Sequence, residues 1–378
     1  MIVPIVLGFY FSVCIGVVLF NICKILSERF FGWCILRRKK KYQLWFWRDG
    51  IKWMDLSFED RDKMVSQIGG NIRSKDHLMA FHKMVDELEA SSPEETARCM
   101  PLFAQIVQRI FYRSANRADK RQAYYSFLIT RFQVMKYAPS ESITAFLMDQ
   151  IQKAHSLYNL ENALRAVYSA GQVSLVLEAL NCLDSTEEIY IHEKLLTDGL
   201  LTFEDADSLI AALWENFSGY HIKMQMLLLD YIRFASGAWK EEMLELLNTT
   251  KELEIQIACI RYFGRYPEER FRMLLYEAAK TYDVTQWEVC SVCMTALAAY
   301  PGKDTIALLK RGLHSRNWHV RYNAALSLRD LEVSSMQLED ILSGDDRYAR
   351  EMLQYRLHMG ELEGKEHLEE NKQEVAAV

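Results

Sequence analysis

Residues 320–328 read VRYNAALSL, and this stretch shows most clearly how the chain is built. A predicted helix over residues 306–313 and a polar turn over residues 314–318 precede it. Moving forward by 29 residues places Arg350 and Leu353 in matching positions, and moving back by 31 places Cys293 there. Self-similarity at a spacing of about 20 to 50 residues is typical of repeat proteins.

The same spacing continues toward the N-terminus through small or apolar residues. The matching positions are Ala163, Leu195, Met226, Ala258, Cys293, Ala324 and Leu353, which are separated by 32, 31, 32, 35, 31 and 29 residues. The chain has only six prolines and 16 glycines, and no extended stretch alternates apolar with polar residues. These features predict an all-α chain with two helices per unit over residues 155–360.

The pattern Val320-Arg321, Ala324-Ala325 and Leu328 resembles the second helix of a HEAT repeat of the short, bacterial type. The resemblance covers roughly residues 155–358 and implies a right-handed α-α superhelix. It also implies that Ala324 and Ala325 allow neighbouring helices to approach closely. TPR repeats, at about 34 residues, are the structural alternative, but their tryptophan-leucine-glycine-tyrosine pattern is not visible.

Two arginines, Arg321 and Arg350, match the family arginine that ties one repeat to the next. The resemblance therefore implies that Arg321 bonds to Asp346 or to nearby turn carbonyls. Ser315 and Gly344 stand where the family usually has a turn aspartate, so the match is partial.

The N-terminal 26 residues form a predicted transmembrane anchor. Ile2 to Cys23 is a stretch of 22 residues without a charged side chain, and at about 1.5 Å per residue a helix of this length crosses a hydrocarbon core of about 30 Å. A cleaved signal peptide, the alternative, needs a basic start and a small-residue cleavage site. Neither is visible here.

A basic and aromatic juxtamembrane segment follows over residues 27–53. Nine basic and two acidic residues between Lys24 and Lys52 give a local charge of +7. Because basic flanks stay on the cytoplasmic side, the sequence predicts a single-pass protein with a cytoplasmic C-terminal body. The predicted membrane contacts are Arg37, Arg38, Lys39, Lys40, Lys41, Trp33, Trp45 and Trp47. Packing of the tryptophans on the body is the alternative.

The rest of the chain is acidic. The whole chain carries −6, so the residues from Trp53 onward sum to −13. Residues 54–154 are expected to form N-terminal helices or degenerate repeats, with a helix start at Ser92-Pro93, and residues 361–378 an acidic tail. No nucleic-acid partner is expected, because phosphate binding needs cations and the basic run already lies beside the bilayer.

No catalytic residue, metal or cofactor is predicted. Cys290 and Cys293 form a CxxC pattern, but they fall on a repeat helix with no second pair, and His192-Glu193 is a single dipeptide. Structural zinc needs four ligands. An enzyme on a HEAT-like scaffold, bilin-lyase-like or metal-dependent, is the alternative function.

The predicted function is therefore that of a membrane-tethered scaffold or regulatory subunit that binds protein partners through a helical-repeat surface. Tryptophan, tyrosine and arginine are common anchors in protein interfaces. The candidate partner-binding residues are Trp287, Trp318, Tyr322 and Arg329. Packing between repeats is the alternative role for the tryptophans.

Overall fold

The computed structural model describes residues 2–47, 57–72, 75–114, 122–153, 156–185, 193–281 and 286–358. Every regular element in these ranges is a helix, and none of them contains a strand. The chain divides into two compact units, Met1–Ile189 and Tyr190–Val378. The predicted start of the repeats at residue 155 lies inside the first unit.

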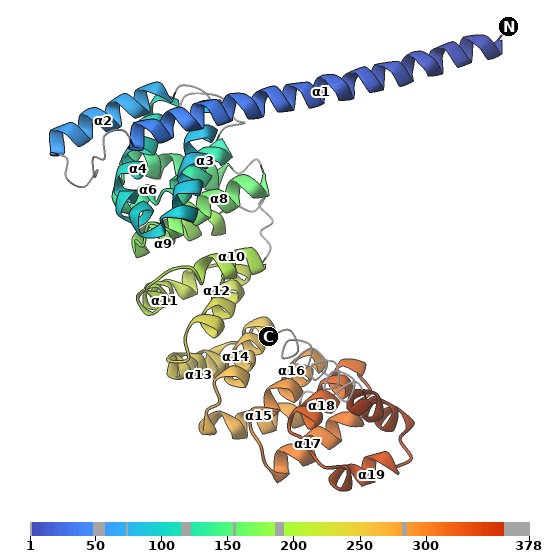
Figure 1. The fold of residues 1–378 in the computed structure, drawn as a ribbon. Helices are drawn as coiled ribbons and strands as arrows, with labels where there is room; N and C mark the ends of the chain where they lie inside the picture. The colour runs from blue at the N-terminus through green and yellow to red at the C-terminus, as the bar shows by residue number, and fades with distance from the viewer. Residues whose placement is uncertain are drawn as a thin grey trace, which may run out of the picture. The chain divides into compact units, whose positions relative to one another are not determined.

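The first unit begins with one very long helix (Figure 1). Its elements are α1 (Ile2–Trp47), α2 (Phe58–Asn71), α3 (Lys75–Ser91), α4 (Pro93–Ser114), α5 (Gln122–Arg131), α6 (Val134–Tyr137), α7 (Glu141–Gln152), α8 (Leu157–Tyr168) and α9 (Val173–Asp184). The predicted helix start at Ser92-Pro93 agrees with the start of α4. Serine side chains accept the amides of Asp60, Ile143 and Asn159 at the starts of α2, α7 and α8.

Helix α1 runs without a break through the boundary that the sequence predicts between the anchor and the juxtamembrane segment. It has 46 residues, which corresponds to about 69 Å at 1.5 Å per residue. Side chains from Phe11 to Phe31 are exposed, and the helix projects beyond the other helices of the unit (Figure 1). It is long and apolar enough to cross a membrane.

The last turns of α1 pack against α3 in the body of the unit. Ile35, Lys39 and Tyr42 are buried on this side, since residues spaced by three or four share one face of a helix. In the core of the unit, the rings of Phe81, Phe103 and Phe132 contact one another, with centroids 5.6–6.3 Å apart. These rings join α3, α4 and the turn after α5 into one core.

The second unit consists of short helices that pack in succession. They are α10 (Glu193–Leu200), α11 (Ala206–Glu215), η4 (Phe217–Gly219), α12 (Ile222–Ala235), α13 (Lys240–Thr249), α14 (Leu253–Arg265), α15 (Glu269–Thr281), α16 (Trp287–Leu297), α17 (Lys303–Leu313), α18 (Trp318–Asp330), η5 (Ser335–Leu338), α19 (Glu339–Leu342) and a helix over residues 347–358. Helices α12, α14, α16 and α18 each pack on the next, while α13, α15 and α17 each pack on the helix that follows (Figure 1).

Hydrogen bonds between these helices join residues about one predicted repeat apart. Asn323 Nδ2 donates to the Ser291 carbonyl at 3.0 Å, and the two residues are 32 positions apart. Ser327 Oγ donates to the Met294 carbonyl at 2.8 Å, across 33 positions. The spacing found in the sequence thus recurs in the contacts.

Small residues allow α16, α17 and α18 to approach closely. Ala324 and Ala325 are fully buried. A Cβ atom at Gly312 would lie 2.6 Å from Met294 Sδ and 3.1 Å from Ala324 Cβ. Cys293, at the position that matches Ala324, is also fully buried, so small side chains at this position fit between the helices.

Arg321 and Arg350 make the same contact in successive turns. Arg321 Nη1 donates to the carbonyls of Ser315 at 2.7 Å and Arg316 at 3.1 Å, and Arg350 Nη1 donates to the Gly344 carbonyl at 2.6 Å. In both cases the arginine bonds to the residue six positions before it. Asp346 bonds instead to His314 Nδ1 at 2.8 Å, so Arg321 binds turn carbonyls and not Asp346.

Arg321→Ala is expected to destabilise the second unit, because a charged hydrogen bond to a partly buried carbonyl contributes about 1.5–3 kcal/mol. A loss of this size lowers the melting temperature of a unit of this length by several degrees, at roughly 2–4 °C per kcal/mol. Circular dichroism of the full-length chain measures the change. The control is Arg347→Ala, whose side chain is 74% exposed and pairs only with Glu351. Equal melting curves for the two variants would contradict the structural role of Arg321.

Candidate functional site

The outer face of the last turns of α1 is exposed and carries both aromatic and cationic side chains. Trp33 is 55% exposed, and the guanidinium carbon of Arg37 lies 5.5 Å from the centroid of its ring. Lys40 and Lys41 are exposed on the same part of the helix. Aromatic rings next to cations suit the headgroup layer of a bilayer.

Two of the five predicted membrane-contact cations point instead toward the body. Arg38 Nη1 lies 2.9 Å from Asp76 Oδ2, and Lys39 Nζ pairs with Glu87. Lys39 is only 9% exposed, and its hydrogen bond to Glu87 lowers the pKa of that carboxyl group. The sequence assigned one role to all five cations, but the structure divides them between the surface and the contact with α3.

Tyr42 strengthens the same contact. Its hydroxyl group lies 2.8 Å from His77 Nδ1, and its ring meets Phe81 edge-on at 6.2 Å. Burial raises the pKa of Tyr42 above its usual value. The side chains of Trp45 and Trp47, also predicted to contact the membrane, lie outside the described residues.

Three of the four predicted partner-binding residues come together at the starts of α16 and α18. The Trp287 ring stacks on His319 at 5.3 Å, and His319 meets Trp318 edge-on at 5.1 Å. Trp318 stacks on Tyr322 at 4.8 Å. Arg329, the fourth candidate, lies near the other end of α18 and pairs with Asp330 at 3.0 Å, so it does not belong to this cluster.

An open cavity of about 440 Å³, which we call the aromatic groove, adjoins this cluster. It lies between α18 and the helix over residues 347–358. Its lining residues are Trp318, Arg321, Tyr322, Tyr348, Glu351, Met352 and Tyr355. Trp318, Tyr348 and Tyr355 are 50%, 68% and 54% exposed. Large aromatic side chains with this much exposed surface are typical of binding surfaces.

Sequence reasoning did not find Tyr348, Met352 or Tyr355. Tyr348 stands 29 positions after His319, whereas the position that matches Trp287 and Trp318 is Arg347. The repeat spacing therefore did not point to Tyr348. Tyr355 and Arg356 lie two turns further along the same helix, where no repeat position marks them.

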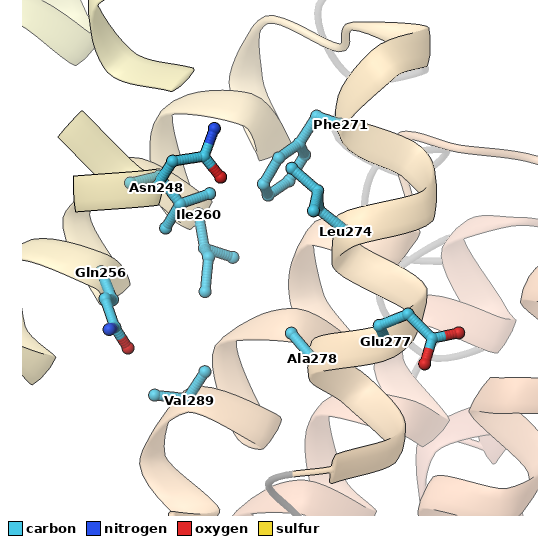
Figure 2. A pocket seen from close by; sticks show the side chains of 9 residues that line it. Asn248, Gln256, Ile260, Phe271, Leu274, Glu277, Ala278 and Val289 are labelled. Atoms are coloured by element: carbon cyan, nitrogen blue, oxygen red, sulfur yellow. The ribbon is translucent and has the colours of Figure 1, made fainter. Parts of the chain in front are cut away.

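A second hollow lies among α13, α14, α15 and α16, with a volume of about 260 Å³. Figure 2 shows Ile260, Phe271 and Leu274 around its opening, with the Glu277 carboxylate directed away from it. Asn248 and Gln256 lie on the same side as Ile260, across from Phe271 and Leu274 (Figure 2). This lining is apolar with two amides, and it lacks the paired acid and base groups that a reaction site needs.

The cysteines in the second unit are packing residues. Cys259, Cys290 and Cys293 are buried, and none of them is in a disulfide. Burial raises the pKa of Cys259 to about 12, which disfavours the reactive thiolate. Within the described ranges no group of three or more His, Cys, Asp or Glu side chains is placed to hold a metal ion. His192 lies outside these ranges.

No family model matches this chain, and neither the curated proteins nor the solved structures contain a match to it.

The division of the basic run predicts opposite effects for two sets of substitutions. Arg37→Gln with Lys40→Gln is expected to reduce the enrichment of phosphatidylserine around the protein, because each cation near an anionic surface contributes about 1 kcal/mol. The melting temperature should stay nearly unchanged. Arg38→Gln with Lys39→Gln should lower the melting temperature, because the ion pairs with α3 are lost, and leave lipid enrichment nearly unchanged.

Both variants are measured in full-length chain reconstituted in lipid nanodiscs, with lipid composition read by mass spectrometry. If the two variants behave alike in both measurements, the cations act as one group. Their division between the membrane surface and the contact with α3 is then wrong.

Proposed function

We propose that this chain is a membrane-anchored scaffold or regulatory subunit whose cytoplasmic body binds protein partners. The observation that carries the proposal is α1 itself, whose exposed apolar length continues as one helix into a buried contact with the body. A helix of this kind would hold a partner-binding surface at the membrane and raise the effective concentration of two partners confined there.

Retention of α1 as an anchor is supported by its sequence and by its surface. The stretch from Ile2 to Cys23 carries no charge, and the side chains from Phe11 to Phe31 are exposed in the part of the chain that the structure describes. A soluble protein rarely exposes so large a contiguous apolar surface. Membrane lipid is the solvent that suits it.

The proposed orientation places the body in the cytoplasm. A run of basic residues directly follows the apolar stretch, and the positive-inside rule keeps such a flank on the cytoplasmic side. Glu28 and Arg29 are the first oppositely charged neighbours along the helix and would lie near the headgroups.

We further propose that the second unit is a HEAT-like repeat array, a right-handed superhelix of helix pairs. The alternating packing of its helices supports this proposal. So do the contacts that span 32 and 33 positions, and the equivalent bonds of Arg321 and Arg350 to their turns. Repeat arrays offer long surfaces suited to binding.

The competing function, an enzyme on the same scaffold, needs acid–base groups or ligands gathered around a cavity. The hollow in Figure 2 has one carboxylate, Glu277, directed away from it. The aromatic groove also has one carboxylate, Glu351, and it pairs with Arg347. Exposed Trp and Tyr side chains, which favour binding, line the groove instead.

A thiol introduced at an exposed position of the body tests the topology. Native Cys99 and Cys182 are poor reporters because burial raises the pKa of both thiols, so they would react weakly on either side of the membrane. Met336 is 88% exposed, and Met336→Cys should therefore react readily wherever reagent reaches it.

In intact cells, a membrane-impermeant maleimide is expected to leave Met336→Cys unlabelled, and permeabilisation should give full labelling. Wild-type chain, treated in the same way, measures the background from the native thiols. Strong labelling of Met336→Cys in sealed cells would place the body outside and overturn the cytoplasmic assignment.

A further inference from the structure

Two guanidinium groups at the aromatic groove have no carboxylate partner among the described residues: Arg321, which lines it, and Arg356, which lies against the lining residue Tyr322. Arg356 is only 7% exposed, and its guanidinium carbon lies 3.6 Å from the centroid of Tyr322. Its Nε atom has no hydrogen-bond partner, and the same holds for Nε of Arg321. The nearby carboxylate of Glu351 pairs with Arg347 at 2.7 Å. Among the described residues, neither Arg321 nor Arg356 pairs with a carboxylate.

This local excess of positive charge differs from the charge of the body as a whole. From Trp53 onward the chain sums to −13, so most of its surface repels an acidic partner. An acidic segment would be attracted at the groove and repelled elsewhere. Complementary charge at one place and like charge around it select both the partner and its position.

The groove is better suited to an anion than to a cation. The rings of Tyr322 and Tyr348 already face the guanidinium groups of Arg356 and Arg321, at 3.6 and 5.4 Å. An incoming ammonium group would have to displace these arginines from the aromatic faces. A carboxylate would instead bind the guanidinium N–H groups in charge-assisted hydrogen bonds, while the cation–π contacts persist.

We propose that the aromatic groove binds an extended acidic segment of a partner protein. A glutamate or aspartate carboxylate of the partner pairs with Arg356 and Arg321, and its neighbouring apolar side chains pack on Trp318, Tyr348 and Tyr355. The proposal rests on the proposed function and adds the chemistry of the partner. Most of the binding free energy comes from the aromatic contacts, and the arginines provide specificity and orientation.

Peptide binding to the full-length chain in nanodiscs tests this proposal. The probe is a library of 12-residue fluorescent peptides that carry one or two Glu or Asp among Leu, Pro and Phe. A matched library carries Gln and Asn instead. Acidic peptides are expected to bind at least tenfold more tightly than their amide counterparts, as measured by fluorescence anisotropy, and added salt should weaken them more.

Two variants locate the binding. Trp318→Ala and Tyr355→Ala, at half-exposed side chains that can be lost with little effect on folding, should each weaken acidic peptides at least tenfold. Met273→Ala is the control, because Met273 is 62% exposed but lies on α15, away from the groove. Arg356→Gln should remove the preference for acidic over amide peptides while leaving weak aromatic binding.

Any of the following results would overturn the proposal. Equal binding of the two libraries would remove the role of charge, and an equal effect of Met273→Ala would remove the groove. Binding that appears only after residues 359–378 are deleted would assign the groove to the acidic tail of the chain itself. Failure of every peptide, with the body still cytoplasmic by labelling, would refute the groove and leave the proposed function standing.

Discussion

The packing of the last turns of α1 on α3 is the contact on which the rest of the account depends. Ile35, Lys39 and Tyr42 form a buried face on a helix whose earlier side chains are exposed. Because α1 has no break, this face fixes the position of the first unit relative to the apolar part of the same helix. A flexible linker would leave that position variable, whereas a continuous helix sets both distance and orientation. Part of the basic run therefore belongs to the contact between α1 and the body.

The second unit follows a different principle, in which each helix is stabilised mainly by its near neighbours. Fully buried Ala324 and Cys293 allow α16 and α18 to lie close together, and Arg321 and Arg350 satisfy the carbonyls of the turns before their helices. Because these local contacts hold the helices together, the side chains at the helix starts are not needed for core packing. Trp318 and Tyr348 lie at two of these helix starts, and their exposed rings belong to the surface on which the proposed binding depends.

Sequence reasoning predicted the all-helical fold and the single apolar N-terminal helix, since both follow from periodicity and from an uncharged stretch of sufficient length. It also proposed Trp287, Trp318, Tyr322 and Arg329 as partner-binding residues, and the structure brings the first three together but not Arg329. It could not divide Arg37–Lys41, since the separation depends on which face of α1 meets Asp76 and Glu87, and these acids lie 38 and 48 positions from their partners. Arg356 was missed for a similar reason: only the approach of Tyr322 from another helix distinguishes it from any other arginine.

The proposed function requires that α1 stays in the mature protein as a membrane anchor that is continuous with the folded body. Its most direct test is to wash native membranes at alkaline pH and determine the intact mass of the protein in the pellet and the supernatant. We expect the chain to remain in the pellet and to retain its N-terminal apolar segment. A shorter chain that lacks this segment and appears in the supernatant would show that α1 is a cleaved leader and would contradict the account.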